Sequence, residues 1–180
     1  MLKPGPNLIL RPYEPNQWEI LNRWQYDEAY QEFFRDSLGP MTEEQLRAYG
    51  VGKQCFMIFK ESNVVGIITI GDVNPITSVA KAGILIDKEY QKSGYFLESL
   101  WIAAQYLFKD LRLRKLVLEV MSTNARLRSM VQKIGFEEEA ILKDEAYLDG
   151  KFFDMARYFI FRDKALVEIE KAKELLCQTQ

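Results

Sequence analysis

Residues 83–98 read GILIDKEYQKSGYFLE, and their pattern sets the architecture expected for the whole chain. The first part, up to Asp87, is rich in β-branched and apolar residues and favours a strand, whereas the second part turns at Gly94 into a helical pattern. The first N–H groups of a helix have no partner inside it and lie at the positive end of its dipole. The junction therefore favours an anion such as a pyrophosphate, which Gly94 lets the backbone approach closely. A glycine turn without a ligand explains the same residues.

Downstream of this junction, helices and strands are expected to alternate before a final hairpin. Asp149-Gly150 is a strong signal for a two-residue hairpin turn, and Gly135 is typical of the position just past a helix end. The expected elements are a helix from Leu97 to Leu111, a strand from Lys115 to Met121, a helix from Asn124 to Ile134, strands from Ala140 to Leu148 and from Phe153 to Arg162, and an amphipathic helix from Asp163 to Cys177.

Upstream of the junction, the sequence predicts short helices followed by an antiparallel meander. Thr42 and Gln45 have the spacing of a capping box, which predicts a helix from there to about Tyr49. The other expected elements are a strand from Leu8 to Pro12, two short helices within residues 15–34, and strands from Cys55 to Lys60, Val64 to Gly71 and Val79 to Asp87. This order predicts an α/β fold with a mixed, mostly antiparallel sheet flanked by helices.

Length and composition predict one domain and exclude several kinds of chemistry. The chain has 180 residues, 48% of them apolar, and no histidine. Without imidazole there is no Ser-His-Asp triad, no Cys-His nucleophile and no HExxH zinc helix. Catalysis is therefore expected to use carboxylates, hydroxyls or backbone amides, without a metal. Residues 1–162 are expected to form the domain, and residues 163–180 a helical extension of it.

Charge and cysteine content bear on partners and location. Lys and Arg number 24 against 26 Asp and Glu, so no basic face for nucleic acid is expected. The two cysteines, Cys55 and Cys177, have no disulfide or zinc spacing, which fits a reducing cytoplasm. No apolar run reaches the roughly 20 residues of a membrane span, so no membrane partner is expected.

Three motifs together resemble the GCN5-related N-acetyltransferase (GNAT) family over nearly the whole chain. The motifs are a loop with Gln91, Gly94 and Phe96, a strand Leu118-Glu119-Val120 followed by Asn124 and Gly135-Phe136, and a hairpin with Asp149-Gly150 and then Asp154. The hairpin pattern is similar to the branch that acetylates ribosomal-protein N-termini and to relatives acting on amino sugars. The resemblance implies acetyl-CoA as co-substrate and direct acetyl transfer to a primary amine in a ternary complex.

The resemblance also implies which residues bind the coenzyme. A bulged strand around Ile84 to Ile86 is expected to offer backbone amides to the thioester, and the loop from Gln91 to Phe96 to hold the pyrophosphate. The cofactor-binding residues expected are Ile84, Leu85, Ile86, Gln91, Lys92, Ser93, Gly94, Tyr95, Phe96 and Asn124. Asn124 is also a favoured helix N-cap, and both roles can coexist.

Glu119 is a carboxylate inside an apolar strand, where ionised side chains are rarely left unpaired. By its position in the resemblance it is expected to be the general base that removes a proton from the amine. The alternative is an ion pair with Lys115, Arg112 or Arg114, or exposure at a sheet edge.

The acceptor is an amine whose identity the sequence leaves open: a protein N-terminus, a lysine, an amino sugar or a polyamine. Trp24, Tyr30 and Phe33 lie in the segment that walls the acceptor site in the family and are expected to bind the substrate. At helical spacing, such aromatic residues equally indicate core.

Several residues depart from the family pattern. Phe96 stands where Gly or Ala is usual, and Leu97 and Leu127 replace small residues, so the pyrophosphate pocket can be partly filled. Val131 stands where many members carry the tyrosine that protonates the leaving thiolate. The general acid is therefore unassigned among Tyr147, Tyr158 and a water. These departures support an alternative, a catalytically silent module that binds or builds a larger assembly.

The C-terminal helix is expected to need a surface to bury its apolar face. Leu166, Ile169, Ala172 or Lys173, and Leu176 follow one stripe, and a helix of about 15 residues is marginal alone in water. We expect it to pack at an interface with a second copy or an assembly partner. Docking on its own domain is the alternative.

Overall fold

The computed structural model describes residues 4–35, 37, 39–51 and 53–178. Its centre is a seven-stranded sheet in the order β1-β2-β3-β4-β5-β7-β6. The strands are β1 (Ile9–Pro12), β2 (Gln54–Lys60), β3 (Asn63–Asn74), β4 (Val79–Ile86), β5 (Lys115–Met121), β6 (Glu137–Leu148) and β7 (Lys151–Phe161). All neighbouring strands are antiparallel except β4 and β5, which are parallel. The predicted mixed, mostly antiparallel sheet is confirmed.

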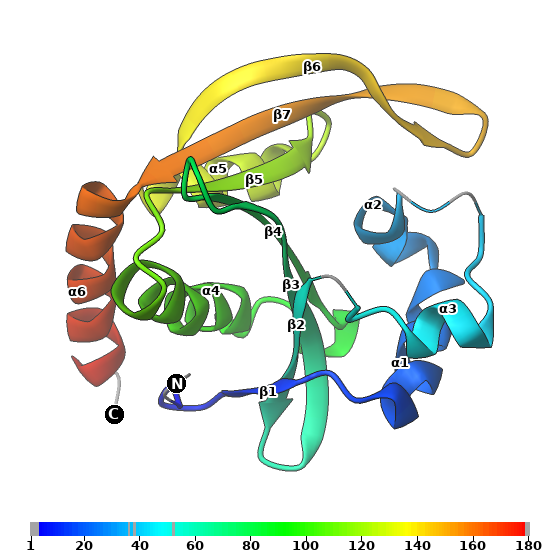
Figure 1. The fold of residues 1–180 in the computed structure, drawn as a ribbon, viewed down its shortest axis with the longest axis horizontal. Helices are drawn as coiled ribbons and strands as arrows, with labels where there is room; N and C mark the ends of the chain where they lie inside the picture. The colour runs from blue at the N-terminus through cyan, green and yellow to red at the C-terminus, as the bar shows by residue number, and fades with distance from the viewer. Residues whose placement is uncertain (1–3, 36, 38, 52, 179–180) are drawn as a thin grey trace.

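The helices cover both faces of this sheet (Figure 1). They are α1 (Trp18–Gln25), α2 (Gln31–Phe34), α3 (Glu43–Arg47), α4 (Tyr95–Gln105), α5 (Ala125–Lys133) and α6 (Arg162–Gln178), with 3-10 turns at Pro15–Gln17, Glu28–Tyr30 and Lys88–Tyr90 and a π turn at Tyr106–Asp110. Two apolar cores result. One lies between the sheet and the side of α4, α5 and α6, and the other lies under α1, α2 and α3.

The expected elements are all present, but some boundaries differ. The strand predicted to end at Gly71 continues to Asn74, and the strand predicted to begin at Ala140 begins at Glu137. Register shifts between Gly71 and Asn74 in β3, and between Glu138 and Ala140 in β6, interrupt the alternation on which the prediction relied.

The expectation that α6 packs at a partner interface needs correction. Ala165 and Ile169 are buried against the protein's own core, and the Trp101 indole N–H of α4 donates to the Ile169 carbonyl at 3.0 Å. The apolar side of the first half of α6 is therefore covered by its own domain. The part of the stripe from Lys173 onward lies outside the side chains that the structure describes.

Candidate active site

The parallel strands β4 and β5 separate partway along their length and open a cavity. They pair from Val79 and Lys115 to Ala82 and Leu118, and Glu119 is the first residue of β5 beyond the last pair. The cavity has a volume of about 510 Å³. It is bounded by β4, β5, the Gln91–Phe96 loop, α2 and the start of α5, so it joins the two faces of the sheet.

The edge of β4 presents backbone groups to this cavity. The Asp87 N–H donates to the Val65 carbonyl of β3, and Leu85 is paired with Ile67 of β3. Because successive residues of a strand direct their polar groups to opposite sides, Ile84 and Ile86 direct theirs toward the opening. The three predicted residues Ile84, Leu85 and Ile86 all line the cavity.

β4 has no β-bulge at Ile84 to Ile86, where the family pattern places one. The β3–β4 register runs without a shift from Gly66 and Ile86 to Gly71 and Lys81. The separation of β4 from β5, rather than a bulge, exposes the backbone groups. The Gln91 side chain occupies one of them, because its Nε2 donates to the Ile86 carbonyl at 3.3 Å.

The glycine loop ends in a left-handed turn that starts α4. Gly94 is the N-cap residue with φ of 78°, and Lys92 also has a positive φ, 71°. The Glu98 N–H is bonded to the Gly94 carbonyl, so the N–H groups of residues 95–97 precede the helix's own hydrogen-bond ladder. Lining the cavity are Gln91, Lys92, Gly94, Tyr95 and Phe96; Ser93 belongs to the same exposed loop but does not line it.

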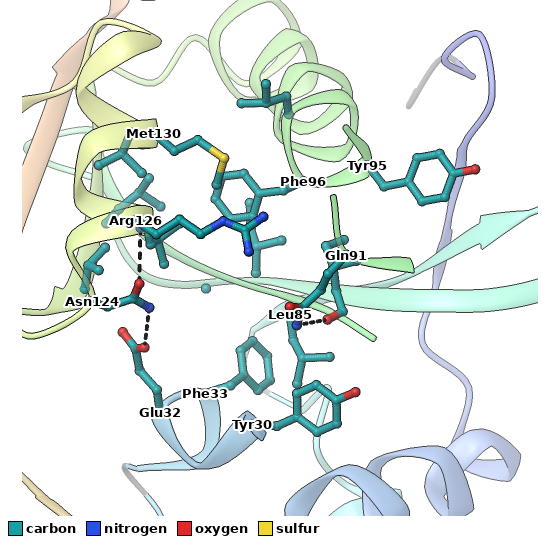
Figure 2. A pocket seen from close by; sticks show the side chains of 18 of the residues that line it. Tyr30, Glu32, Phe33, Leu85, Gln91, Tyr95, Phe96, Asn124, Arg126 and Met130 are labelled. Atoms are coloured by element: carbon teal, nitrogen blue, oxygen red, sulfur yellow. Dashed lines mark hydrogen bonds between the residues drawn. The ribbon is translucent and has the colours of Figure 1, made fainter. Parts of the chain in front are cut away.

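The two aromatic residues of this turn point in different directions (Figure 2). The Phe96 ring points toward Met130 of α5, whereas Tyr95 points away from α5. Phe96 therefore fills space between α4 and α5. The other departures from the family pattern, Leu97, Leu127 and Val131, line the same cavity.

Glu119 lies at the centre of a cluster of cations. Its Oε1 accepts from Arg157 Nε at 3.1 Å and Nη2 at 2.8 Å, and its Oε2 lies 3.1 Å from Arg35 Nη2 and 2.5 Å from Lys81 Nζ. The Glu119 side chain is only 3% exposed. Burial would raise its pKa, but the hydrogen bonds and charges of Lys81 and Arg157 outweigh burial, and the pKa is lowered.

The contacts of Glu119 bear on its two predicted roles, general base and ion-pair partner. Both carboxylate oxygens are engaged by cations, which supports the ion-pair alternative. The partners are not those the sequence suggested, since Lys115 pairs instead with Glu139. A carboxylate with a lowered pKa is a weaker base, so the general-base role stays a prediction.

The cluster faces α2 rather than α4. Lys81 and Glu119 alternate along their strands with Ala82 and Leu118, which belong to the core under α4. Arg35 follows α2 directly, and the Phe33 ring of α2 lies against Gly83 of β4. The cations therefore occupy the α2 face of the sheet at the mouth of the opening.

The aromatic residues predicted for the acceptor separate into two groups. Tyr30 and Phe33 line the cavity (Figure 2). Trp24 does not: it is 1% exposed in the core under α1, and its indole N–H donates to Asp87 at 2.8 Å. The prediction that Trp24 binds substrate is therefore wrong, because the helical stripe carrying it faces the core.

Asp87 anchors this wall of the cavity. Burial would raise its pKa, but hydrogen bonds from Trp24, the Glu89 N–H and the Tyr30 hydroxyl, with the charge of Arg23, hold it lowered. The ionised carboxylate thereby ties α1 and the Glu28–Tyr30 turn to the end of β4.

Both the oxygen and the nitrogen of the Asn124 side-chain amide form hydrogen bonds at the N-terminus of α5. Its Oδ1 accepts from the Leu127 N–H at 3.1 Å, so the N-cap prediction is confirmed. Its Nδ2 donates to Glu32 of α2 at 3.1 Å, and the other Glu32 oxygen accepts from the Met121 N–H at 2.7 Å (Figure 2). A contact of Asn124 with the coenzyme stays a prediction.

The tyrosines offered as general acids lie away from the cavity. Val131, at the position where many family members carry the tyrosine, is fully buried. Tyr147 is exposed on β6, and the buried Tyr158 hydroxyl donates to Glu138 and accepts from Arg128. Tyr30 does line the cavity, but burial raises its pKa to about 12. A water is the remaining candidate of the three named from the sequence.

Sequence reasoning missed five charged residues of the site: Glu32, Arg35 and Arg126, which line the cavity, and Lys81 and Arg157, which contact Glu119. Lys81 and Arg157 carried a usable signal, because each is a charge with apolar neighbours on both sides in its strand, as Glu119 is. The strand register that brings them together is not readable from spacing alone. Within the described ranges, no group of three or more Cys, Asp or Glu side chains is placed to hold a metal ion, and no helix has the length and apolarity to cross a membrane.

Comparisons with known proteins agree on one family. The family model described as "Acetyltransferase (GNAT) domain" matches residues 7–137. The chain is 26% identical to the spermidine N(1)-acetyltransferase of Vibrio cholerae over 152 residues, which cover 84% of this chain and 85% of that protein. It is also 26% identical to the ribosomal-protein-serine acetyltransferase of Escherichia coli over 57% of this chain and 58% of that protein.

Solved structures agree on the fold. The spermidine N-acetyltransferase of Vibrio cholerae, solved in complex with CoA and spermine, matches with a TM-score of 0.79 at 23% identity. The match covers 89% of this chain and 98% of that one.

Proposed function

The chain belongs to the acetyltransferase (GNAT) domain family and is an N-acetyltransferase, and from this membership we propose that it transfers acetyl from acetyl-CoA directly to a primary amine in a ternary complex. The observation that carries the proposal is the opening between β4 and β5. It connects a helix start suited to an anion on one side with an acceptor face under α2 on the other. Relatives named as enzymes support this reading over a catalytically silent module.

The residues present fit acetyl-CoA. The start of α4 offers backbone N–H groups and a positive dipole end to a pyrophosphate, and Gly94, which has no side chain, lets it approach closely. Lys92 adds a cation from the same loop. Ile84 and Ile86 turn backbone groups toward the opening, where an extended amide-containing chain can pair with them. When bound, acetyl-CoA supplies the acetyl group as an activated thioester.

The acceptor face positions the amine. Phe33 and Tyr30 wall it from α2 and the preceding turn, while Arg35 and Glu119 form its polar side. The amine nitrogen attacks the thioester carbonyl carbon; the C–N bond forms and the C–S bond breaks, with its electron pair passing to sulfur. The proton that the nitrogen loses then neutralises the thiolate, through water. Holding both reactants at one opening supplies the orientation that such a step requires.

Proton removal from the ammonium form is the step for which Glu119 was predicted as base. Because cations bind both carboxylate oxygens of Glu119, the contacts support a structural role instead. In this role Glu119 holds Lys81, Arg35 and Arg157 in one arrangement. An α-amino group, with an ordinary pKa of about 7.7 to 8.0, is partly neutral near pH 7.5 and can lose its proton to water. The general-base role is retained as the alternative that a pH profile separates.

The test combines binding with product detection. Acetyl-CoA at a hundredfold excess over its Kd should stabilise the fold by about 2.7 kcal/mol. With an amine panel of amino acids, N-terminal peptides, amino sugars and spermidine, mass spectrometry should find an acetylated amine and a thiol reagent should find an equal amount of free CoA. Absence of thermal stabilisation by millimolar acetyl-CoA would overturn the cofactor assignment. Stabilisation without product from any amine class would overturn the transfer.

A further inference from the structure

We propose that the acceptor amine carries a carboxylate, which Lys81 and Arg157 bind at the mouth of the β4–β5 opening; this inference rests on the proposed function. The carboxylate belongs either to a free amino acid or to an acidic side chain next to a peptide N-terminus. The shared chemistry is an amine with an anion a few bonds away.

The charge of the cluster is the first reason. Lys81 and Arg157 share one carboxylate, Glu119, so one positive charge is left over between them even when Arg35 is not counted. The next pairs on this part of the sheet are matched one to one, Lys115 with Glu139 and Lys143 with Asp154. Of these three groups of charges, only the cluster at the opening has more cations than carboxylates.

Exposure is the second reason. The Lys81 and Arg157 side chains are 31% and 39% exposed, whereas that of Glu119 is 3% exposed. The cations thus reach outward from a buried counterion. Arg157 uses Nε and Nη2 on Glu119, and among the described residues none accepts from its Nη1. A guanidinium has five N–H donors and an ammonium three, so both groups can hold a second carboxylate.

Position is the third reason. Glu119 lines the cavity as the first residue beyond the last β4–β5 pair, so Lys81 and Arg157, which contact Glu119 without lining the cavity themselves, lie beside the opening. An anion held there places an amine only a few bonds away at the opening. Glu119 keeps the two cations in place and neutralises only one of their two charges, as expected of a preorganised anion site.

The same charges disfavour a polycation. A polyamine would meet Lys81, Arg157 and Arg35 at the mouth of the site, and like charges brought together lower affinity. The two carboxylates lining the cavity are already engaged, Glu119 by cations and Glu32 by the Met121 N–H and Asn124. Spermidine, the substrate named for the Vibrio cholerae relative, is therefore expected to be a poor acceptor for this chain.

Equilibrium binding tests this without turnover, using acetylated products in the presence of saturating CoA. The probes are two matched pairs: N-acetylglycine with N-acetylglycinamide, and acetyl-Ala-Glu-amide with acetyl-Ala-Gln-amide. We expect the carboxylate member of one pair to bind at least tenfold more tightly than its amide, the usual worth of a charge-assisted hydrogen bond. Preference within the first pair identifies a free amino acid, and preference within the second identifies a peptide.

Variants then assign the preference to the cluster. Lys81→Gln and Arg157→Gln should each reduce the ratio toward one, and Arg157→Lys should restore part of it. Lys143→Gln, which removes an exposed cation that pairs with Asp154 and not with Glu119, should leave the ratio unchanged. Equal binding of acid and amide in both pairs, or tighter binding of N-acetylspermidine, overturns the inference. Acetylation of neutral amines in the activity assay would still uphold the proposed function, so the two failures are distinguishable.

Discussion

The ammonium of Lys81 on β4 lies 2.5 Å from Oε2 of Glu119 on β5, so this ion pair crosses the last backbone pair of the two strands, Ala82 and Leu118. A charged side-chain contact thus joins the two strands at the place where their backbones separate. Glu119 also receives Arg157 from β7 and Arg35 from the α2 side. One buried carboxylate therefore holds together the mouth of the cavity.

Glu119→Gln should destabilise the fold in a pH-dependent way. The ordinary pKa of a glutamate is 4.5 and that of Glu119 is lowered in the folded state, so its contribution is complete above about pH 4.5 and is lost as the pH falls through the lowered pKa. We expect a loss of up to about 3 kcal/mol at pH 7, because the cations keep partial hydration. Urea unfolding from pH 7 to pH 3 should show the gap from the parent protein closing toward acid pH. A gap constant over that range would contradict an ionic role.

The same variant separates the two roles of Glu119 in turnover. If Glu119 holds the cations, the kcat/KM of Glu119→Gln should be lowered by a similar factor at pH 7 and pH 9. A general base would instead give a defect of about 10² to 10⁴ that shrinks above the pKa of the amine, where the acceptor is already neutral. A pH–rate profile of both proteins on one acceptor makes the distinction, and a shrinking defect would restore the base.

Gly94→Asp should abolish stabilisation by acetyl-CoA. The substitution places a carboxylate at the start of α4, where the diphosphate is proposed to bind. Gly150→Asp is a matched control, because Gly150 has φ of 77° against 78° for Gly94 and an added Cβ meets open space at both. Both variants should lose about 1 to 2 kcal/mol from backbone strain. Only Gly94→Asp should lose the thermal shift, and its retention would place the pyrophosphate elsewhere.

Most of the fold could be predicted from local signals in the sequence. Asp149-Gly150 marks the hairpin, and the run from Gly83 to Glu98 gives a strand, a turn and a helix in the observed order. Such features depend on neighbours in sequence, through backbone conformation and hydrogen-bond periodicity. The residues of the glycine loop could therefore be named before the structure was known.

The partners of Glu119 could not be predicted in the same way. Sequence proximity suggested Lys115, Arg112 or Arg114, but the contacts come from β4, β7 and the end of α2. They depend on strand register and on how α2 sits over the sheet, both of which are set by packing between distant segments. Trp24 failed for a related reason, since an aromatic residue on a helix can face a core or a cavity and only the neighbours of α1 decide which.

Trp24 and Phe33 should give opposite results on substitution. Trp24→Phe removes the indole N–H that Asp87 accepts and should cost about 1 to 3 kcal/mol of stability, with the acceptor KM unchanged. Phe33→Ala removes a cavity wall and should raise the acceptor KM several-fold. Thermal denaturation and steady-state kinetics on both variants check this. A raised KM in Trp24→Phe at full folding would return Trp24 to the acceptor site.

Glu98→Ala should loosen the N-terminal segment. The Glu98 carboxylate is 2% exposed and accepts from the N–H groups of Asn7 and Leu8 at 2.7 and 2.8 Å and from the Asn7 side chain at 3.0 Å. Its removal leaves these donors unsatisfied and should cost about 2 to 4 kcal/mol. Glu43→Ala, which breaks an exposed i,i+4 pair with Arg47, should cost about 0.5 kcal/mol or less. Hydrogen exchange at Leu8 should accelerate only in Glu98→Ala.

The two sides of the first half of α6 should respond differently to substitution, because one side packs on the protein's own domain. Ile169 is 4% exposed and its carbonyl accepts the Trp101 indole N–H, whereas Val167, on the same helix, is 53% exposed. Ile169→Ala should therefore cost about 2 to 5 kcal/mol and Val167→Ala about 0.5 kcal/mol or less. Neither should change the molar mass measured by light scattering, because the buried side of the helix faces α4 rather than a second chain. Truncation after Arg162 should yield an unstable product, since it uncovers Trp101 and the core beneath it. A stable truncated protein of lower oligomeric mass would instead show that α6 serves an interface.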